Sequence, residues 1–244
     1  MSGWDQSAEA WLAEQGDDGD WGRRFVLDRI MLERVRIQPP RTALDVGCGE
    51  GRFCRVLAAD GIETTGVEPT ARLREAAIER HPGGNYIDAF AEHMPLPDAS
   101  FELVVSYLSL IDIPDFRTAI GEMSRLLAPG GRLLIANLTS FNTAGMGAGW
   151  IDGPNGQRVF PIDHYLEEAP ENVAWRGIEI VNWHRPLSAY MLALLGAGLQ
   201  LTYFDEPAPA GFPPEDSTKA DRYRRVPYFL VMEWAKPTGD NHVS

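Results

Sequence analysis

One short segment, ALDVGCGEGRF at residues 43–53, restricts the fold of this chain more than any other. Ala43, Leu44 and Val46 have the apolar character of a buried strand, and glycines follow at alternate positions. Glycine permits a tight turn and lets a ligand approach the backbone closely. The pattern predicts a strand, a glycine-rich turn and a helix whose first N–H groups can face a polar or anionic ligand.

The spacing of these glycines separates two classes of cofactor. A dinucleotide-binding turn has the pattern G-x-G-x-x-G. With Gly47 and Gly49 as its first two glycines, the third would fall at Arg52, whereas this sequence has Gly51. Asp45 stands two residues before the first glycine, where its carboxylate can reach the turn or a cationic ligand. A glycine turn without a ligand is the alternative, because such short patterns also occur by chance.

The composition limits the partners that we expect. The 244 residues are 44% hydrophobic, which suffices for one large domain or for one domain with an insertion. Lys and Arg total 22 against 35 Asp and Glu, so the formal net charge is −13. A domain this acidic repels nucleic-acid phosphates, and the basic cluster Arg222, Arg224 and Arg225 is short enough for an ordinary solvated surface. We therefore expect no nucleic-acid partner.

The cysteine spacing and the N-terminal segment indicate the cellular compartment of the protein. Cys48 and Cys54 match neither a zinc-ligand spacing nor a disulfide framework, which is typical of a reducing compartment. The N-terminal segment lacks the basic and apolar regions of a secretory signal. No apolar run reaches the roughly 18 residues of a membrane span. The sequence therefore predicts a cytoplasmic protein with no membrane partner and no bound metal.

Strand-like and helix-like segments alternate along most of the chain. Strands are predicted at residues 43–46, 63–68, 85–90, 100–110, 128–138, 199–207 and 224–234. Helices are predicted at residues 5–14, 21–35, 52–60, 70–80, 116–127 and 187–198. This alternation predicts an α/β fold: a Rossmann-like, doubly wound sheet of seven mostly parallel strands, with N-terminal helices and an insertion that forms a lid.

The same pattern suggests a division of the chain into parts. These are an N-terminal helical cap (1–38), a cofactor-binding core (39–140), a lid (141–183), a C-terminal completion of the sheet (184–237) and a tail (238–244). The lid assignment rests on the loss of periodicity in a stretch rich in Gly, Trp and Asn. The alternative is that this stretch packs against the rest of the protein without contacting a ligand.

Parallel strands place their carboxyl ends at one edge, where open α/β sheets bind ligands. The segments predicted at this edge follow five strands: Gly47–Gly51, Glu68, Phe90–Glu92, Ser106–Leu108 and Asn137–Ser140. Five strand ends that meet in one crevice indicate a ligand site more strongly than any single motif.

Together these segments resemble the class I S-adenosylmethionine (SAM)-dependent methyltransferases, in particular the small-molecule, type 11 group related to the ubiquinone-biosynthesis methyltransferases. The resemblance covers about residues 40–236 and is most specific between 43 and 137. In that family the glycine turn lies under the amino-acid part of SAM, and an acidic residue at the position of Glu68 binds both ribose hydroxyls. A carboxylate suits this role because it accepts two hydrogen bonds at once.

The resemblance implies a set of cofactor-binding positions for SAM and its product S-adenosylhomocysteine (SAH). They are Asp45, Gly47, Cys48, Gly49, Gly51, Glu68, Pro69, Phe90, Ala91, Glu92, Ser106 and Arg24. The segment AFAEHMPLPDASFELV resembles the one that passes the adenine ring, but Phe90 replaces the usual aspartate. We therefore expect backbone groups of Phe90 and Ala91 to hold the ring. Arg23 or Arg24 is expected to pair with the SAM carboxylate, since a guanidinium matches a carboxylate bidentately.

The sequence says less about the methyl acceptor than about the cofactor. His184, His164 and Tyr165 are the candidate catalytic residues if the acceptor must lose a proton. Aromatic residues in the lid favour an apolar or planar small-molecule acceptor, although they also suit packing. After the fourth strand the chain reads SYLS, without the [DN]-P-P-[YF] motif of DNA-amino and glutamine-amide methyltransferases.

The sequence therefore predicts a SAM-dependent methyltransferase for a small molecule, as a monomer or homodimer. Two alternatives stay open: an inactive SAM-binding or regulatory protein of the same fold, and a nucleotide-dependent oxidoreductase.

Overall fold

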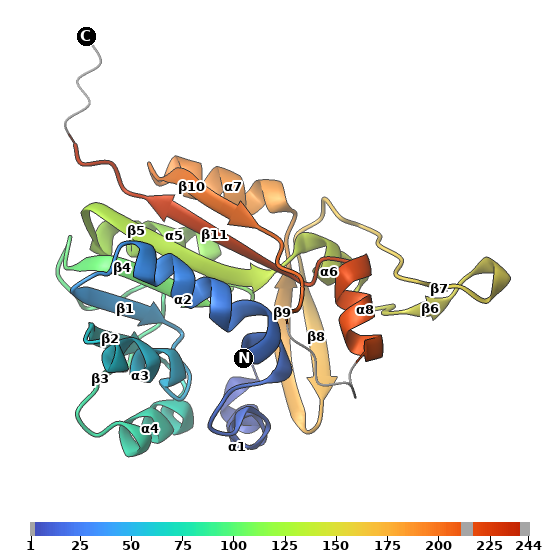
Figure 1. The fold of residues 1–244 in the computed structure, drawn as a ribbon, viewed down its shortest axis with the longest axis horizontal. Coiled ribbons are helices and arrows are strands. Elements are labelled where there is room, and N and C mark those ends of the chain that lie inside the picture. The colour runs from blue at the N-terminus through green and yellow to red at the C-terminus, as the bar shows by residue number, and fades with distance from the viewer. Residues whose placement is uncertain (1–2, 211–216, 240–244) are drawn as a thin grey trace, which may run out of the picture.

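The computed structural model describes residues 3–210 and 217–239, which form a mostly parallel sheet of seven strands in the order β10-β11-β5-β4-β1-β2-β3 (Figure 1). The strands are β1 (Thr42–Val46), β2 (Glu63–Val67), β3 (Asn85–Ile87), β4 (Phe101–Tyr107), β5 (Leu127–Leu138), β10 (Gln200–Asp205) and β11 (Phe229–Ala235). The pairs from β3 to β5 are parallel, and β11 runs antiparallel to both of its neighbours. The predicted fold class is confirmed.

Helices cover both faces of the sheet, with α2 in front and α5 behind it in Figure 1. The helices are α1 (Trp4–Gln15), α2 (Asp28–Ile37), α3 (Arg52–Ala59), α4 (Ala71–Arg80), α5 (Phe116–Leu126), α6 (Ser140–Gly145), α7 (Leu187–Gly196) and α8 (Ser217–Arg225). A hydrophobic core lies on each face of the sheet, and successive residues of a strand point into different cores. On β4, Val104 packs toward α5 and α7, and Val105 packs toward α2 and α3. The period of two along a strand explains this split.

Several predicted elements have different bounds in the structure. The third strand ends at Ile87 rather than at 90, because the chain turns away and Phe90 forms an isolated bridge with His93. The predicted helix at 21–35 consists of a π-helical turn, η1 (Arg23–Leu27), followed by α2. The last strand begins at Phe229, and the preceding residues from 217 to 225 form α8, which the sequence analysis missed.

The predicted lid region contains regular structure that the sequence analysis did not foresee. It holds a small hairpin, β6 (Ile151–Asp152) and β7 (Arg158–Val159), around a 3-10 turn η2 (Pro154–Gly156), and a longer hairpin, β8 (Ala169–Trp175) and β9 (Ile178–His184). Arg176 and Gly177 join β8 to β9 with positive φ angles of 46° and 84°. Two residues with positive φ are typical of a tight hairpin turn.

The long hairpin stands beyond the ends of the central strands, beside α1 and α6 (Figure 1). Ser7 on α1 is buried, and its hydroxyl bonds both the carbonyl and the amide of Glu179 on β9, each at 2.9 Å. Glu14 pairs with Arg176 at 2.8 Å at the far end of the same contact. Helix α1 and β9 therefore form one continuous wall at this edge of the sheet.

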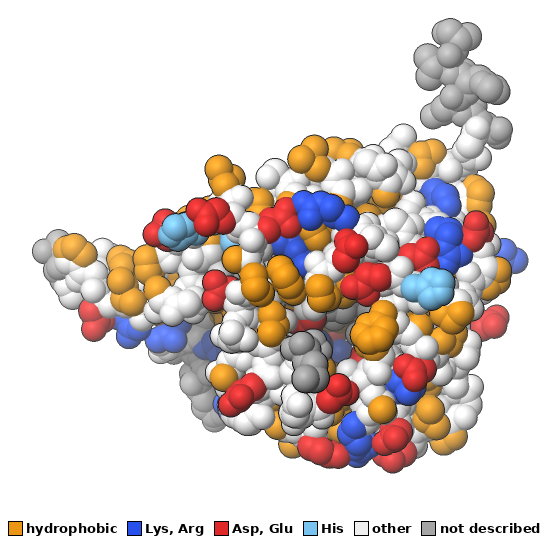
Figure 2. Space-filling model, turned by 180° about the vertical axis from the view of Figure 1, so that it is seen from behind, with side chains coloured by type: hydrophobic (Ala, Val, Ile, Leu, Met, Phe, Trp, Pro, Cys, Tyr) orange, Lys and Arg blue, Asp and Glu red, His pale blue; other side chains and the backbone are white. Residues whose placement is uncertain are grey.

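Neither the visible surface nor the helices of the described residues offer an extended basic area or a membrane-spanning segment. Figure 2 shows one face on which acidic and basic side chains interleave, without an extended basic area. Within the described residues, no helix combines the length and apolar character needed to cross a membrane.

Candidate functional site

The glycine turn lies at the carboxyl end of β1, as the sequence predicts. The amides of Gly47 and Cys48 both donate to the carbonyl of Val67 on β2, at 2.8 and 3.1 Å. Gly47, Gly49 and Gly51 have φ angles of 72°, 56° and 75°, in the left-handed region that favours glycine. A Cβ on Gly47 would lie only 2.5 Å from Cβ of Ser109. The turn therefore requires glycine for its conformation and for its packing.

Glu68 connects the ends of the first two strands. Its carboxylate accepts the amide of Gly49 at 3.0 Å and that of Thr70 at 2.9 Å. Burial raises the pKa of Glu68, and the two amide hydrogen bonds oppose that rise. The Thr70 side chain is a third hydrogen-bond donor to this carboxylate. Two carboxylate oxygens have four lone pairs, so one acceptor position stays open. Glu68 can therefore shape the turn and also accept a hydrogen bond from a ligand hydroxyl.

Asp45 is a buried carboxyl with an unused oxygen. It is 3% exposed, and its Oδ1 atom has no hydrogen-bond partner among the described residues. Its Oδ2 atom lies 3.8 Å from the thiol of Cys54. Burial raises the pKa of Asp45 to about 7. An orphaned carboxylate oxygen beside a glycine turn fits a ligand that brings a cationic, hydrogen-bond-donating group.

The N-terminal cap brings Arg23, rather than Arg24, to this site. Arg24 is exposed, with its guanidinium over the ring of Phe25. Arg23 lies over the rings of Trp11 and Tyr107, and its charge opposes the rise in the pKa of Asp45. Of the two arginines predicted for the cofactor carboxylate, this geometry favours Arg23: the two residues are neighbours on η1, and the helical turn directs them to different sides.

Trp11 covers the glycine turn from α1. A Cβ on Gly49 would lie 2.9 Å from the Cη2 atom of Trp11. Cys48, the other predicted cofactor residue of the turn, is buried, and burial together with the neighbouring thiol of Cys54 raises its pKa. The glycine turn, Glu68 and the cap thus form one closed surface.

The segment predicted beside the adenine ring follows β3 at the same edge. Phe90 is 68% exposed and Ala91 is buried, whereas Glu92 and Pro69 are partly buried. The Phe90 side chain has no polar group, so contact with the adenine ring through backbone groups of Phe90 and Ala91 stays a prediction.

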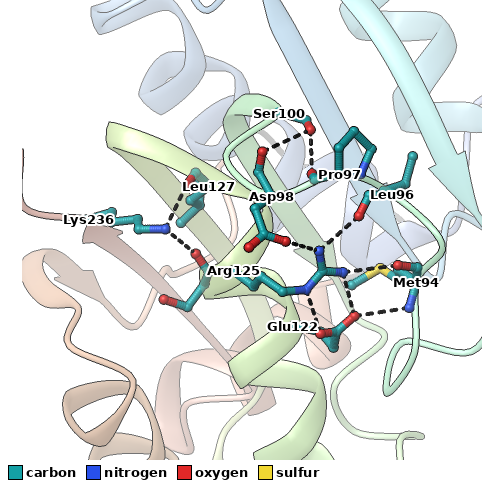
Figure 3. Close-up of polar contacts among 10 residues, drawn as sticks. Met94, Leu96, Pro97, Asp98, Ser100, Glu122, Arg125, Leu127 and Lys236 are labelled. Atoms are coloured by element: carbon teal, nitrogen blue, oxygen red, sulfur yellow. Dashed lines mark hydrogen bonds and ion pairs between the residues drawn. The ribbon is translucent and has the colours of Figure 1, made fainter.

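Arg125 on α5 fixes the next part of this segment (Figure 3). Its guanidinium donates to the carbonyls of Leu96 at 2.8 Å and Met94 at 3.0 Å. It also pairs with Asp98 at 2.6 Å and with Glu122 at 2.7 Å, and Glu122 accepts the Met94 amide at 3.1 Å. This network joins the adenine segment to α5 and holds Met94, which is buried, and Leu96, which is partly buried, against the core.

Ser106 lies at the end of β4 with its hydroxyl already engaged. Its Oγ atom is 2.8 Å from Oγ of Ser109, which donates to the carbonyl of Val46 at 2.5 Å. The two serines therefore brace the strand ends of β1 and β4. Leu108, between them, has a φ of 60°, an uncommon conformation for a residue other than glycine.

His184 is buried at the end of β9, and both ring nitrogens have partners. Nδ1 lies 2.6 Å from the hydroxyl of Thr143, and Nε2 lies 3.0 Å from the carbonyl of Tyr165. A carbonyl only accepts, so Nε2 donates to Tyr165, while Nδ1 is engaged with the Thr143 hydroxyl. This geometry argues against His184 as a free general base and assigns it to positioning of α6 and the lid.

The other two candidate catalytic residues are less enclosed. The side chain of His164 is 70% exposed and bonds Glu167 at 2.8 Å, which raises its pKa. The ring of Tyr165 is partly buried and packs against Phe141 and His184, at centroid distances of 5.4 and 5.9 Å. Of the three, the structure brings only Tyr165 and His184 together.

The sequence analysis missed Asp112, which follows β4 in the loop at 108–115. Its carboxyl accepts a hydrogen bond from the Asn182 amide on β9 and another from Trp4 on α1. Burial raises its pKa to about 8. The only available signal was an acidic residue, in SLIDIPD, within six positions of a strand end. Over the residues that the structure describes, no group of three His, Cys, Asp or Glu residues is placed to hold a metal ion.

Comparison with known proteins agrees with this geometry. Residues 44–135 match a family model described as a methyltransferase domain. An S-adenosylmethionine-dependent methyltransferase from Mesorhizobium loti superposes with a TM-score of 0.76 at 25% identity, covering 90% of this chain and all of that one. Residues 44–135 therefore carry a methyltransferase domain. The chain shares its fold with S-adenosylmethionine-dependent methyltransferases of class I.

Curated relatives match over part of their length. Malonyl-[acyl-carrier protein] O-methyltransferase from Serratia marcescens is 29% identical over 148 residues, which is 58% of this chain and 58% of the relative. O-methyltransferase cnsE from Penicillium expansum is 38% identical over 125 residues, or 46% of this chain and 45% of the relative. The chain therefore spans about half the length of the curated relatives that it matches.

Proposed function

We propose that this protein transfers a methyl group from SAM to a small-molecule acceptor. The observation that carries the proposal is the glycine turn closed by Glu68, with the unpartnered Asp45 oxygen beside it. Bound SAM supplies an activated methyl group on a sulfonium. Asp45 and Arg23 would hold its amino-acid part, and Glu68 its ribose. Transfer of a methyl group then depends mainly on alignment and on exclusion of water.

The α1–β9 contact and the lid residues beside it support the exclusion of water from the proposed site. The buried α1–β9 contact and the aromatic pair of Phe141 and Tyr165 would shield the reacting groups from water. His184 would hold Tyr165 in place through its backbone carbonyl. Tyr165 and His164 are the residues left to take a proton from a hydroxyl or amine acceptor, whereas a carboxylate acceptor needs no base.

The relatives favour an oxygen acceptor. Both are O-methyltransferases by name, and one acts on a malonyl group attached to a carrier protein. We therefore place hydroxyl and carboxyl compounds first in an acceptor search. The free, buried Cys48 and Cys54 are consistent with a cytoplasmic location, and light scattering would distinguish a monomer from a homodimer.

Calorimetric titration with SAM, SAH and NADH in parallel tests the proposal. Micromolar binding of SAM and SAH, with no binding of NADH, would support it, and methyl transfer in an acceptor screen would complete it. SAM binding without turnover of any acceptor would favour an inactive, regulatory protein. NADH binding would restore the oxidoreductase alternative, which the structure disfavours because Arg52 is engaged in an ion pair with Asp28.

A further inference from the structure

Three buried polar side chains at the end of β5 and the start of α6 each have an atom without a partner. They are Asn137, Ser140 and Asn142, which are 1%, 3% and 1% exposed. The Oδ1 atoms of the two asparagines and the Oγ atom of the serine have no hydrogen-bond partner among the described residues. Buried polar groups are almost always hydrogen-bonded, because an unpartnered one loses its bonds to water without replacement. Three such atoms in one short segment are therefore typical of a place where a ligand supplies the partners.

The chain itself keeps these three side chains close together. Asn137 and Ser140 are three residues apart, which limits the separation of their Cα atoms to about 11 Å, and Ser140 and Asn142 belong to the first turn of α6. The backbone here is already engaged, since the Asn142 amide donates to the Thr139 hydroxyl at 3.1 Å and the Thr139 amide donates to the Tyr228 carbonyl at 3.0 Å. The unpartnered atoms are therefore side-chain atoms on a backbone that β11 holds in place.

The hydrogen bond between Asn142 and Tyr228 shows which end of the Asn142 amide is free. Burial raises the pKa of Tyr228, and the side-chain hydrogen bond from Asn142 opposes that rise, as a donating N–H group does. The amide nitrogen is therefore engaged, and the oxygen is the free end. An amide oxygen only accepts hydrogen bonds, whereas a serine hydroxyl can donate or accept. The free atoms thus require a ligand that donates hydrogen bonds.

This segment lies at the same edge of the sheet as the glycine turn. The carbonyl of Ala136, next to Asn137, accepts the amide of Leu108 at 2.8 Å, and Ser109 in the same loop donates to the carbonyl of Val46, just before the turn. In the sheet, β5 is two strands from β1, and neighbouring strands lie about 4.8 Å apart. The end of β5 is therefore on the order of 10 Å from the end of β1, which leaves room for the methyl group of a donor held at the turn.

The lid lies against the same segment. The ring of Phe141 packs against Tyr165 with 5.4 Å between centroids, and the Thr143 hydroxyl lies 2.6 Å from Nδ1 of His184. The Nε2 atom of His184 is engaged with the Tyr165 carbonyl at 3.0 Å. These contacts present hydroxyl, aromatic and already bonded imidazole groups, and none of them offers a free cation to an acidic ligand.

The arginine beside His184 is committed to the backbone. Arg185 is 1% exposed, and its guanidinium donates to the carbonyls of Leu110 and Pro114 at 3.0 Å each and to that of Ile113 at 2.5 Å. It therefore holds the loop after β4 and is not available as the counter-ion of a bound carboxylate.

Resting on the proposed function, we propose that Asn137, Ser140 and Asn142 form the acceptor subsite, and that the acceptor is a neutral alcohol or phenol rather than a carboxylate. A hydroxyl donates to the free amide oxygens, whereas a carboxylate would set its own acceptor oxygens against them. In the transfer, the acceptor oxygen forms a bond to the methyl carbon as the S–CH₃ bond of SAM breaks. SAH and the methyl ether are the products, and the hydroxyl proton passes to solvent.

An apolar substitution of similar volume tests whether these atoms are unpartnered in the folded protein. Asn137→Leu removes an amide that has no partner for its oxygen, so the urea midpoint should rise, as for a binding group kept at a cost to stability. Asn182→Leu is the matched control, because Asn182 is also buried but donates to Asp112, and its midpoint should fall. A fall for Asn137→Leu as well would show that the fold or an ordered water satisfies this amide, and would overturn the proposal.

Ligand-observed NMR on the SAH-saturated protein tests the class of acceptor. Phenol and benzoate are the probes, because they share a planar ring and differ in charge and in hydrogen-bond donation. We expect saturation transfer to phenol to be about fivefold stronger than to benzoate, and to fall by about fivefold in Asn137→Leu while SAH affinity changes less than threefold. A benzoate signal equal to or stronger than that of phenol, no phenol signal, or a phenol signal unchanged in the variant would overturn the proposal.

The outcomes distinguish this inference from the proposed function. If neither SAM nor SAH binds in calorimetry, the cofactor assignment fails, and the urea midpoints and the probe signals on the ligand-free protein still decide whether the polar subsite exists. If SAM and SAH bind but benzoate matches phenol, the methyltransferase proposal stands and the neutral-acceptor proposal is overturned. The comparison of the two probes on the wild type decides the acceptor class even if Asn137→Leu does not fold.

Discussion

The carboxylate of Glu68 accepts the backbone amide of Gly49 at 3.0 Å, so that the end of β2 holds the glycine turn that follows β1. The same carboxylate bonds the amide of Thr70 at 2.9 Å, just before α4. One side chain thereby sets the relative position of two strand ends and of the helix that follows. Its remaining lone pair lies at the edge where class I methyltransferases bind SAM.

Glu68→Gln tests this double role. The amide side chain retains one acceptor oxygen and loses the negative charge, so it can satisfy only one of the two backbone donors fully. We expect SAM affinity to fall tenfold or more, since hydrogen bonds to a charged group contribute about 1.5–3 kcal/mol. Calorimetric titration measures the change. Glu63→Gln, at the exposed start of the same strand, is the control, and equal affinities in the two variants would refute the ribose assignment.

Gly49→Ala tests the packing of the cap on the turn. Gly49 has a φ of 56°, and an added Cβ would lie 2.9 Å from Trp11. Gly61→Ala is a matched control, because Gly61 has a φ of 82° with nothing within 4 Å of the added Cβ. We expect the control to lose about 1 kcal/mol of unfolding free energy from backbone strain, and Gly49→Ala about 1–2 kcal/mol more from overpacking.

Urea unfolding gives both free energies, and tryptophan fluorescence reports whether Trp11 moves. Equal losses in the two variants would mean that α1 does not press on the turn in solution.

Arg23→Gln tests the ion pair of Arg23 with Asp20 through acid stability. Although burial raises the pKa of Asp20, the charge and hydrogen bonds of Arg23 lower it further, to about 2. A carboxyl with a lowered folded-state pKa stabilises the protein above its ordinary pKa of 3.8, and this contribution is lost as the pH falls toward 2. The variant should therefore lose about 1–2 kcal/mol at pH 6 and less near pH 2.

Arg24→Gln is the control, since its side chain is exposed on the neighbouring position of η1. We expect it to change neither acid stability nor SAM affinity, whereas Arg23→Gln should weaken SAM binding. A larger loss of SAM affinity in Arg24→Gln would indicate that Arg24, and not Arg23, pairs with the SAM carboxylate.

Asp112 should make the ligand-free protein less stable at alkaline pH. Its folded-state pKa is raised to about 8, so the folded state binds its proton more tightly than the unfolded state does. That stabilisation is complete below the ordinary pKa of 3.8 and is lost as the pH rises toward 8. We expect the unfolding free energy of the wild type to fall between pH 6 and pH 9 by at least about 1 kcal/mol more than that of Asp112→Asn. Parallel curves in urea titrations would show that Asp112 is solvated.

The sequence contained enough information for the sheet and the glycine turn, because both depend on local patterns. Apolar runs and glycine spacing predicted the strand ends, and Glu68 falls at the expected one. The hairpin of β8 and β9 escaped notice because its first strand is mostly exposed and has little apolar alternation. Its position depends on long-range contacts such as that between Ser7 and Glu179, which no local pattern encodes.

The arrangement of the site residues also depends on contacts that no local sequence pattern encodes. Arg23 and Arg24 are adjacent in the sequence, and only the turn of η1 decides which one faces the crevice. His184 was predicted as a catalytic candidate on its residue type, yet its burial and its two partners follow from the lid. Asp112 carries no motif, and its raised pKa results from three segments that meet only in the folded chain.

Arg125→Lys tests whether the adenine segment depends on its anchor in α5. Arg125 reaches the carbonyls of Met94 and Leu96 and the carboxylate of Asp98 at once, and lysine cannot reproduce this planar, multiple contact. We expect a loss of about 1–2 kcal/mol in unfolding free energy. We also expect SAM affinity to fall by less than in Glu68→Gln, because the contacts to the adenine ring are predicted to come from backbone groups. Arg29→Lys, with a 70% exposed side chain, should change neither quantity. An unchanged urea midpoint for Arg125→Lys would show that the segment holds its position through its apolar contacts alone.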